Sequence, residues 1–127
     1  MTSIIHNSKY NFDESKEINA WGLQREMCFL YMFTELGLLE STIEYLEIGS
    51  MEGASVCWVR ENTDKRSRLT TIDIYELPTL LNNLRTADSD FSINFIEGDS
   101  ADVLPRLIDA GKLFDVIYVD GDHEYDG

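Results

Sequence analysis

Runs of strand-forming residues alternate with helical runs along most of this chain, and this alternation limits the possible folds more than any other feature. Branched and aromatic residues predict four strands, over 43–48, 69–74, 91–96 and 114–119. Apolar periodicity predicts helices over 15–39, 53–61, 77–87 and 100–110, the last shortened or kinked by Pro105. Strands joined by crossover helices pair in parallel and are covered on both faces, which predicts an α/β protein.

The handedness of such crossovers narrows the topology further. Right-handed crossovers favour a Rossmann-like, doubly wound parallel sheet, here partial, with about four strands in the order 3-2-1-4 and an N-terminal helix. A chain of 127 residues is long enough for one domain with a core. Residues 1–14 are polar and aperiodic and are expected to form a flexible arm, with 15–127 forming the domain. In the first helix, one buried stripe is predicted to consist of Leu23, Met27, Leu30, Tyr31 and Leu38.

The formal net charge of −14 argues against a nucleic-acid partner, because an acidic surface repels phosphates. The basic cluster over 65–68 is interpreted as a solvated turn. Cys28 and Cys57 lack metal-type spacing, and both are expected to be reduced thiols in the core. The sequence shows neither a basic leader nor an apolar run of membrane-spanning length, so we expect no membrane partner and a cytoplasmic location.

In doubly wound sheets ligands bind beyond the carboxyl ends of the strands, and unusual residues follow all four predicted strands. After the first strand, Gly49 permits a tight turn, and Gly53 lets the next helix pack closely with its N-terminal amides open to a ligand. Met51 and Ala54 stand where a dinucleotide fingerprint has glycines, so the loop suits a small carboxylate better than a diphosphate. A plain structural turn is the alternative.

The other strand ends carry acidic residues. Asp73 lies at the end of the second strand, where a carboxylate accepts hydrogen bonds from ribose hydroxyls, unless it is only a solvated acid. Asp99 and Ser100 follow the third strand, where they either contact an adenine edge or cap the next helix. Asp120 follows the fourth strand and opens the acidic run DGDHEYDG. The joint placement of these residues predicts one ligand cleft at one rim of the sheet.

Four segments also carry a family resemblance: YLEIGSMEGAS (45–55), LTTIDIYE (69–76), EGDSADVLPRL (97–107) and VIYVDGDHEYDG (116–127). Together they resemble the N-terminal half of class I S-adenosylmethionine-dependent methyltransferases. Within that class they are most similar to the small-molecule O-methyltransferases of the catechol and caffeoyl-coenzyme A type and to the methyltransferase-24 family. The resemblance implies an enzyme that moves a methyl group from S-adenosylmethionine to a small-molecule hydroxyl.

The resemblance further implies roles for individual residues. The cofactor-binding residues that it implies are Glu47, Gly49, Ser50, Gly53, Ser55, Asp73, Ile74, Asp99, Ser100 and Asp120. Within this set, Ser55 would lie at the methionine carboxylate, Asp73 would hold the ribose and Ile74 would flank the adenine. Asp99 and Ser100 would lie near the adenine amine.

In metal-dependent members of the family, the acid in the place of Asp120 binds a divalent cation, usually magnesium. A lysine three residues later serves as the base there, and His123 stands at that position in this chain. A bound dication lowers the pKa of a hydroxyl while a nearby base removes its proton. His123 is therefore the candidate catalytic base, with a role in orienting the loop as the alternative.

The family fold carries three more strands after the last residue of this sequence. Without them the apolar fourth strand would present an open edge, which folded proteins avoid. We expect either a fragment of a longer enzyme, itself inactive, or a homodimer in which a second copy covers that edge. Two other functions stay open: a Rossmann-like nucleotide-binding module without methyltransferase activity, and a metal-dependent glycosyltransferase, the latter because Asp120 and Asp122 form a DxD pattern.

Overall fold

The computed structural model describes residues 4, 7–12, 23–49, 53–74, 78–87 and 93–119. Four strands form one parallel sheet, β1 (Glu44–Ile48), β2 (Arg68–Asp73), β3 (Ile93–Glu97) and β4 (Val116–Val119). Their order in the sheet is β3-β2-β1-β4, so the predicted fold class and strand order are confirmed. The predicted strand ends differ from the observed ones by at most two residues.

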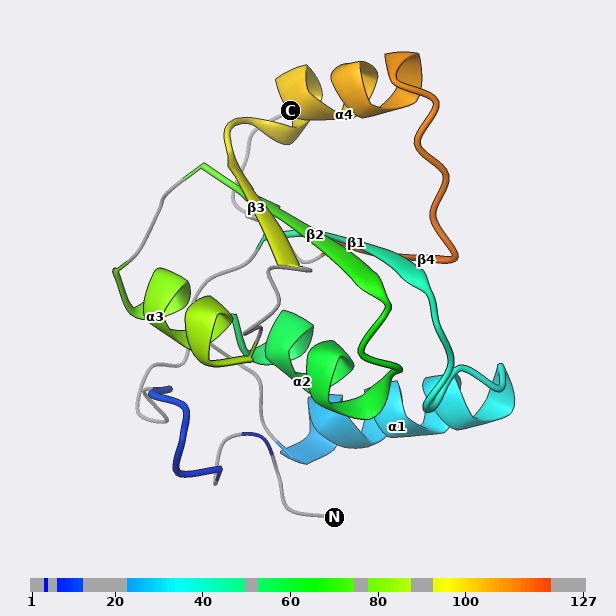
Figure 1. Cartoon of the computed structure of the whole chain (residues 1–127), viewed down its shortest axis with the longest axis vertical. Helices are drawn as coiled ribbons and strands as arrows, with labels where there is room; N and C mark the ends of the chain where they lie inside the picture. Colours follow the sequence, from blue (N-terminus) through cyan, green and yellow to red (C-terminus); the bar gives the residue numbers. More distant parts are fainter. Residues whose placement is uncertain are drawn as a thin grey trace.

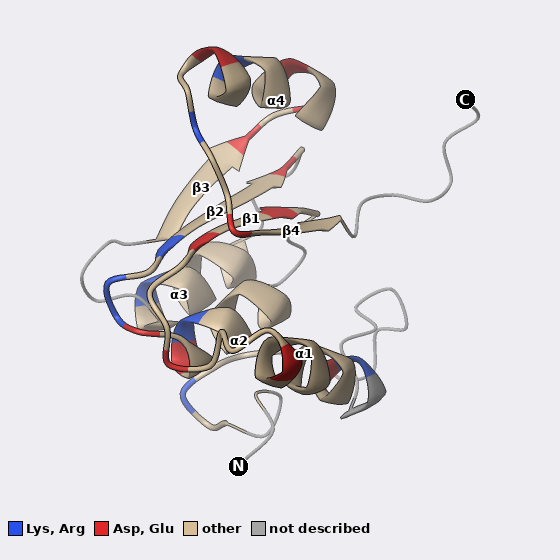
Figure 2. Ribbon diagram, turned by 90° about the vertical axis from the view of Figure 1, so that its right-hand side faces the viewer, with Lys and Arg blue, Asp and Glu red and all other residues tan. Residues whose placement is uncertain are grey.

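Helices cover both faces of this sheet. Helices α1 (Leu23–Glu35), α2 (Ala54–Asn62) and α3 (Pro78–Ala87) lie on one face, and α4 (Ser100–Asp109) lies on the other (Figures 1 and 2). Helix α4 continues through Pro105 and buries Val103 against Leu46 and Ile72. The larger core lies on the opposite face, between the sheet and the other three helices.

Aromatic packing defines the centre of the larger core. Trp58 of α2 is buried against Phe29 and Phe33 of α1, with edge-to-face ring contacts at centroid distances of 5.7 and 5.3 Å. Phe29 also meets the ring of Tyr118 of β4 at 4.8 Å. Such pairs add about 0.5–1.5 kcal/mol each beyond the area that they bury. These rings therefore attach α1 to both α2 and β4.

The buried side of α1 differs from the predicted stripe. Met27 and Tyr31 are 60% and 69% exposed, so their assignment to the core was wrong. Glu26, Phe29 and Phe33 form the buried side instead. Periodicity failed here because this helix is apolar nearly all round, so a second equally plausible stripe exists in the same sequence.

The two cysteines also differ from each other. Cys57 is buried in α2, as expected, and its thiol is free. Cys28 lies on the exposed side of α1, so the prediction of a core thiol was wrong for this residue. The same ambiguity in the periodicity of α1 explains the error.

The described part of the N-terminal segment packs against the helices. Ile4 and Tyr10 belong to the larger core, and the Ile4 amide donates to Glu26 at 2.7 Å. Asn11 and the buried Asn83 of α3 exchange two hydrogen bonds of 2.8 and 3.0 Å. The flexibility of residues 1–14 stays a prediction, but these contacts hold the described residues on α1 and α3.

Glu61 of α2 forms the charged end of this attachment. Its carboxylate accepts a hydrogen bond from Tyr10 at 2.6 Å and pairs with Lys9. Partial burial raises the pKa of Glu61, but the bonds from Lys9 and Tyr10 outweigh it and hold the pKa below the ordinary 4.5. The ionised carboxylate is therefore the form that stabilises the folded chain.

We expect the Glu61 contribution to stability to be lost in acid. Because the pKa is lowered on folding, the contribution is fully present above the ordinary pKa and disappears as the pH falls through the lowered value. Urea denaturation of the wild type and of Glu61→Gln should therefore show a stability difference at neutral pH that vanishes in acid. A difference that does not change with pH would contradict this assignment.

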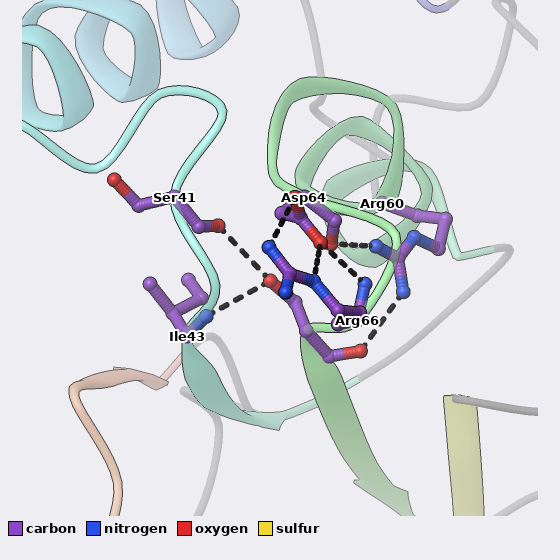
Figure 3. A network of polar contacts seen from close by, with 6 residues as sticks. Ser41, Ile43, Arg60, Asp64 and Arg66 are labelled. Atoms are coloured by element: carbon purple, nitrogen blue, oxygen red, sulfur yellow. Dashed lines mark hydrogen bonds and ion pairs between the residues drawn. The ribbon is translucent and has the colours of Figure 1, made fainter.

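The predicted basic turn lies at the amino ends of the strands, away from the expected ligand rim. Asp64 accepts from the amide and guanidinium of Arg66, while Arg60 donates to the carbonyls of Ser67 and Asp64 (Figure 3). Ser67 is fully buried, and its hydroxyl accepts from the Ile43 amide and donates to the Ser41 carbonyl. The cluster is a turn, as interpreted, and the Arg66 guanidinium forms its hydrogen bonds with Asp64 of the same turn.

In the described part of the chain, no helix has the length and apolar character that a membrane span requires.

Candidate functional site

The carboxyl ends of the strands meet at one rim of the sheet. The Gly49 amide donates to the Ile72 carbonyl at 2.8 Å, and the Gly98 amide donates to the Asp73 carbonyl at 2.9 Å. In the register, Ile48 of β1 pairs with Ile72 of β2 and with Val119 of β4. The turns after β1, β2 and β3 are therefore adjacent, which brings the described rim residues together as predicted. Ser50, Asp120 and His123 lie outside the described residues.

Gly53 determines how α2 begins at this rim. Its φ of +89° lies in the left-handed region, and an added Cβ would lie 2.9 Å from Leu80 Cδ1 of α3. No side chain of the described residues caps α2, and its first turn holds no acidic residue. The first amides of a helix have no partner within the helix. Such a helix start is the kind of place where small anions bind in proteins, and binding of a carboxylate here stays a prediction.

Glu47 lies at the end of β1 with its side chain enclosed by hydroxyl groups. Its carboxylate accepts from Tyr45 at 2.9 Å, from Thr71 at 3.3 Å and from Ser55 through a short bond. The residue is fully buried, on the side of the sheet that faces α2. Ser55, in the first turn of α2, is also buried. The carboxylate thus connects β1, β2 and the start of α2.

This arrangement changes how the predicted roles of Glu47 and Ser55 are understood. Glu47 is enclosed by its own chain, so it supports the rim through Ser55 rather than presenting an open surface. A serine hydroxyl has a single proton, and Ser55 directs it to Glu47. Donation to a ligand carboxylate would require that hydroxyl to turn away from Glu47.

Cys57, two residues after Ser55 in α2, is chemically inert in this setting. Burial raises the pKa of its thiol well above the ordinary value, and the negative charge of Glu47 raises it further. The thiol therefore stays protonated near neutral pH. Cys57 is a packing residue and not a nucleophile.

The remaining rim residues use local hydrogen bonds. The Asp73 carboxylate accepts from the amide of Ile74 at 2.7 Å, and the Ile74 side chain is 52% exposed at the rim. Asp99 is the N-cap of α4, since its side chain accepts from the Ala101 amide at 2.9 Å. This confirms the expected cap, and the exposed carboxylate of Asp99 lies beside Ser100 at the same rim.

Sequence reasoning missed two residues of this site. Tyr45 and Thr71 hold Glu47, and although both lie in segments of the family resemblance, the resemblance implies no role for either. A weak signal exists, because Tyr45 and Glu47 share a face of β1, and the register places Thr71 beside Glu47. The register itself cannot be read from the sequence, so the hydroxyl cluster is visible only in the structure.

Within the described residues, no group of three or more His, Cys, Asp and Glu side chains could hold a metal ion. The predicted cation ligand Asp120 and the predicted base His123 are not among these residues. The described part of the site therefore consists of the start of α2 and the carboxyl ends of the strands of a Rossmann-like sheet.

Comparison with known proteins assigns the family. Residues 46–127 match the sequence model of the methyltransferase domain family known as methyltransferase-24. The chain therefore belongs to this methyltransferase domain family. A catechol O-methyltransferase of Niastella koreensis is 30% identical over 80 residues, which is 61% of this chain and 36% of that protein.

Solved structures share the fold. An O-methyltransferase from Bacillus cereus in complex with SAH is 21% identical, with a TM-score of 0.64, over 80% of this chain and 46% of that one. The O-methyltransferase TomG from Streptomyces achromogenes, in complex with SAM, is 25% identical, with a TM-score of 0.63, over 80% of this chain and 45% of that one. This chain thus spans less than half the length of each of these relatives.

Proposed function

We propose that this chain forms the cofactor-binding half of an S-adenosylmethionine-dependent methyltransferase that methylates a hydroxyl of a small molecule. The observation that carries the proposal is the start of α2 behind Gly53, which no described side chain caps, at the same rim as Asp73. Membership of the methyltransferase family supports it. The S-adenosyl ligands in the complexes of the two solved O-methyltransferases support the choice of cofactor.

The residues of the rim fit the parts of this cofactor. The α2 amides are proposed to bind its carboxylate, with the Ser55 hydroxyl turning from Glu47 to donate to it, and Asp73 is proposed to accept from the ribose hydroxyls. The exposed Ile74 would cover one face of the adenine, while Asp99 and Ser100 would lie near the adenine amine. When bound, the cofactor supplies an activated methyl group, and the rim supplies its position and orientation.

The metal-assisted form of the reaction is proposed through Asp120 and His123. Support comes from the sequence position of Asp120, which directly follows Val119, the β4 residue that pairs with Ile48 at the rim. Asp120 would hold a magnesium ion that lowers the pKa of the acceptor hydroxyl, and His123 would remove its proton.

Calorimetry on the intact chain tests the proposal. We expect S-adenosylhomocysteine to bind and NAD to give no signal, because the loop after β1 lacks the glycines of a dinucleotide site. Binding of NAD alone would favour the nucleotide-binding module instead. Binding of a nucleotide-sugar only with manganese would favour the glycosyltransferase.

We expect Asp73→Ala to weaken S-adenosylhomocysteine binding by about 1–3 kcal/mol, roughly 5- to 150-fold in Kd, because a polar pair is lost. Titration calorimetry at neutral pH measures the change. Asp109→Ala is the matched control. Asp99 caps the start of α4 at the rim, and Asp109 is the last residue of α4, so Asp109 lies at the helix end away from the rim. Equal affinities for the two variants would show that Asp73 does not contact the ligand.

The partners of the chain follow from the same proposal. The acceptor would be a small molecule, and the outer side of β4 would be covered by further residues of a longer enzyme or by a second copy. Ile117 and Val119 of β4 lie on the face of the sheet opposite Val116 and Tyr118 and are largely exposed, which supports a covering partner over that part of β4. Two free thiols support a reducing, cytoplasmic location.

A further inference from the structure

Glu47 is a buried carboxylate directly behind the proposed cofactor site. Its side chain is fully buried, and Ser55, whose hydroxyl donates to it, lies in the first turn of α2 at the rim. We propose that Glu47 is an internal competitor of the ligand, because it holds the proton that Ser55 would donate to the carboxylate of an S-adenosyl compound. Glu47 would thereby limit the affinity for the amino-acid end of that compound. This inference rests on the proposed function and adds a positioning residue to it.

The competition follows from the chemistry of the hydroxyl group. An ionised carboxylate only accepts hydrogen bonds, and a serine hydroxyl has one proton to donate, which in the structure goes to Glu47 Oε1. A hydrogen bond to an ionised acceptor is roughly twice as strong as one between neutral groups. A ligand carboxylate must therefore replace a strong bond of Ser55 with another of the same kind. The net gain in affinity from Ser55 is then close to zero.

The other partners of Glu47 allow this exchange to take place without disruption. Oε1 also accepts from Tyr45 at 2.9 Å, and Oε2 accepts from Thr71 at 3.3 Å. Both donors are fully buried and belong to strands β1 and β2, whereas Ser55 belongs to the helix start at the rim. When the Ser55 hydroxyl turns to a ligand, Glu47 keeps these two donors. One rotating hydroxyl thus exchanges one acceptor for another while the strands stay in place.

Neutralising Glu47 should therefore tighten ligand binding. Glu47→Gln keeps the length of the side chain and an acceptor oxygen, but a neutral acceptor holds the Ser55 proton less strongly. We expect the Kd for S-adenosylhomocysteine to fall about threefold to tenfold in titration calorimetry, which is the difference between a charged and a neutral acceptor. The affinity for 5′-methylthioadenosine, which lacks the amino-acid end, should not change. Glu44→Gln, at the other end of β1, removes the same charge and should leave both affinities unchanged.

Ser55→Ala tests whether Glu47 acts through Ser55. Because the two bonds of the hydroxyl nearly balance, Ser55→Ala alone should change the Kd for S-adenosylhomocysteine by less than about threefold. In the Ser55→Ala background, Glu47→Gln should no longer tighten binding, since no hydroxyl proton is left to release. A double-mutant cycle measures this coupling. A change in core packing or in net charge would act equally in both backgrounds.

Tyr45→Phe provides a second test with the opposite sign. The variant keeps the ring in the core and removes one donor to Glu47, so the carboxylate should hold Ser55 more firmly. We expect the Kd for S-adenosylhomocysteine to rise about threefold, in contrast to the fall with Glu47→Gln. Urea denaturation of each variant establishes that it is folded at the temperature of the calorimetry.

The outcomes separate this inference from the proposed function. If the wild type binds S-adenosylhomocysteine but Glu47→Gln binds it equally or more weakly, the inference is overturned and the proposed function stands. A gain that persists in the Ser55→Ala background would also overturn the inference, because Glu47 would then not act through Ser55. If neither the wild type nor Glu47→Gln bound S-adenosylhomocysteine, both would be overturned together.

Discussion

Replacing Glu47 with alanine is expected to destabilise the chain by about 3 kcal/mol or more. The change removes the acceptor of three hydroxyl groups, on Tyr45, Ser55 and Thr71, and leaves them inside the protein. A buried polar group that loses its partner costs about 1–3 kcal/mol, and the space left by the side chain adds to the loss. Urea denaturation followed by tryptophan fluorescence measures the change.

Two further variants make this result specific. Glu47→Gln keeps the volume and one acceptor oxygen, so we expect about 1 kcal/mol of destabilisation. Glu44→Ala, on the same strand, removes a partly exposed partner of Arg68 and should cost less than about 0.5 kcal/mol. If Glu47→Ala were as stable as Glu44→Ala, the hydroxyl cluster would have no role in stability.

Gly53→Ala is expected to lower the free energy of unfolding by about 2–4 kcal/mol. It should also weaken S-adenosylhomocysteine binding at least about tenfold. Two effects combine, because φ is +89° and the new Cβ would lie 2.9 Å from Leu80, which is fully buried and has little room to move. The start of α2 would have to shift, and the amides proposed to bind the ligand carboxylate would shift with it. Thermal denaturation and calorimetry measure the two losses.

Gly37→Ala separates the conformational part of this effect from the packing part. Gly37 has a φ of +68°, but an added Cβ would meet no atom within 4 Å. Gly37→Ala should therefore lower the free energy of unfolding by about 1 kcal/mol and leave S-adenosylhomocysteine binding unchanged. In a Leu80→Ala background the penalty of Gly53→Ala should shrink, because the obstructing side chain is gone. Equal penalties for the two glycines would rule out the contact with Leu80.

The fold was predictable because its signals are periodic and repeated. Each strand is a short branched run and each crossover is a helical run, so small errors at the ends do not change the topology. The rim was predictable for the same reason, since Gly49, Asp73 and Asp99 lie at or just beyond the ends of strands that run in one direction. Strand direction, and not any single motif, brought these residues together.

The parts that could not be predicted depend on a choice between faces or on register. In α1 both sides are apolar, and the aromatic rings of Phe29 and Phe33 selected the buried side by packing on Trp58. The partners of Glu47 come from two strands and a helix, so they required the three-dimensional register. The roles of Ser50, Asp120 and His123 remain predictions, since these residues lie outside the described part of the chain.

The outer side of β4 has a practical consequence for work with this protein. In the described sheet β4 pairs with β1 alone, and its neighbouring apolar side chains, Ile117 and Val119, are 58% and 63% exposed. Backbone groups along such a margin are a template on which extended polypeptide from any source can add. Fusion tags rich in alternating apolar residues should therefore promote precipitation on warming, whereas a lysine introduced at Ile117 should keep concentrated samples clear.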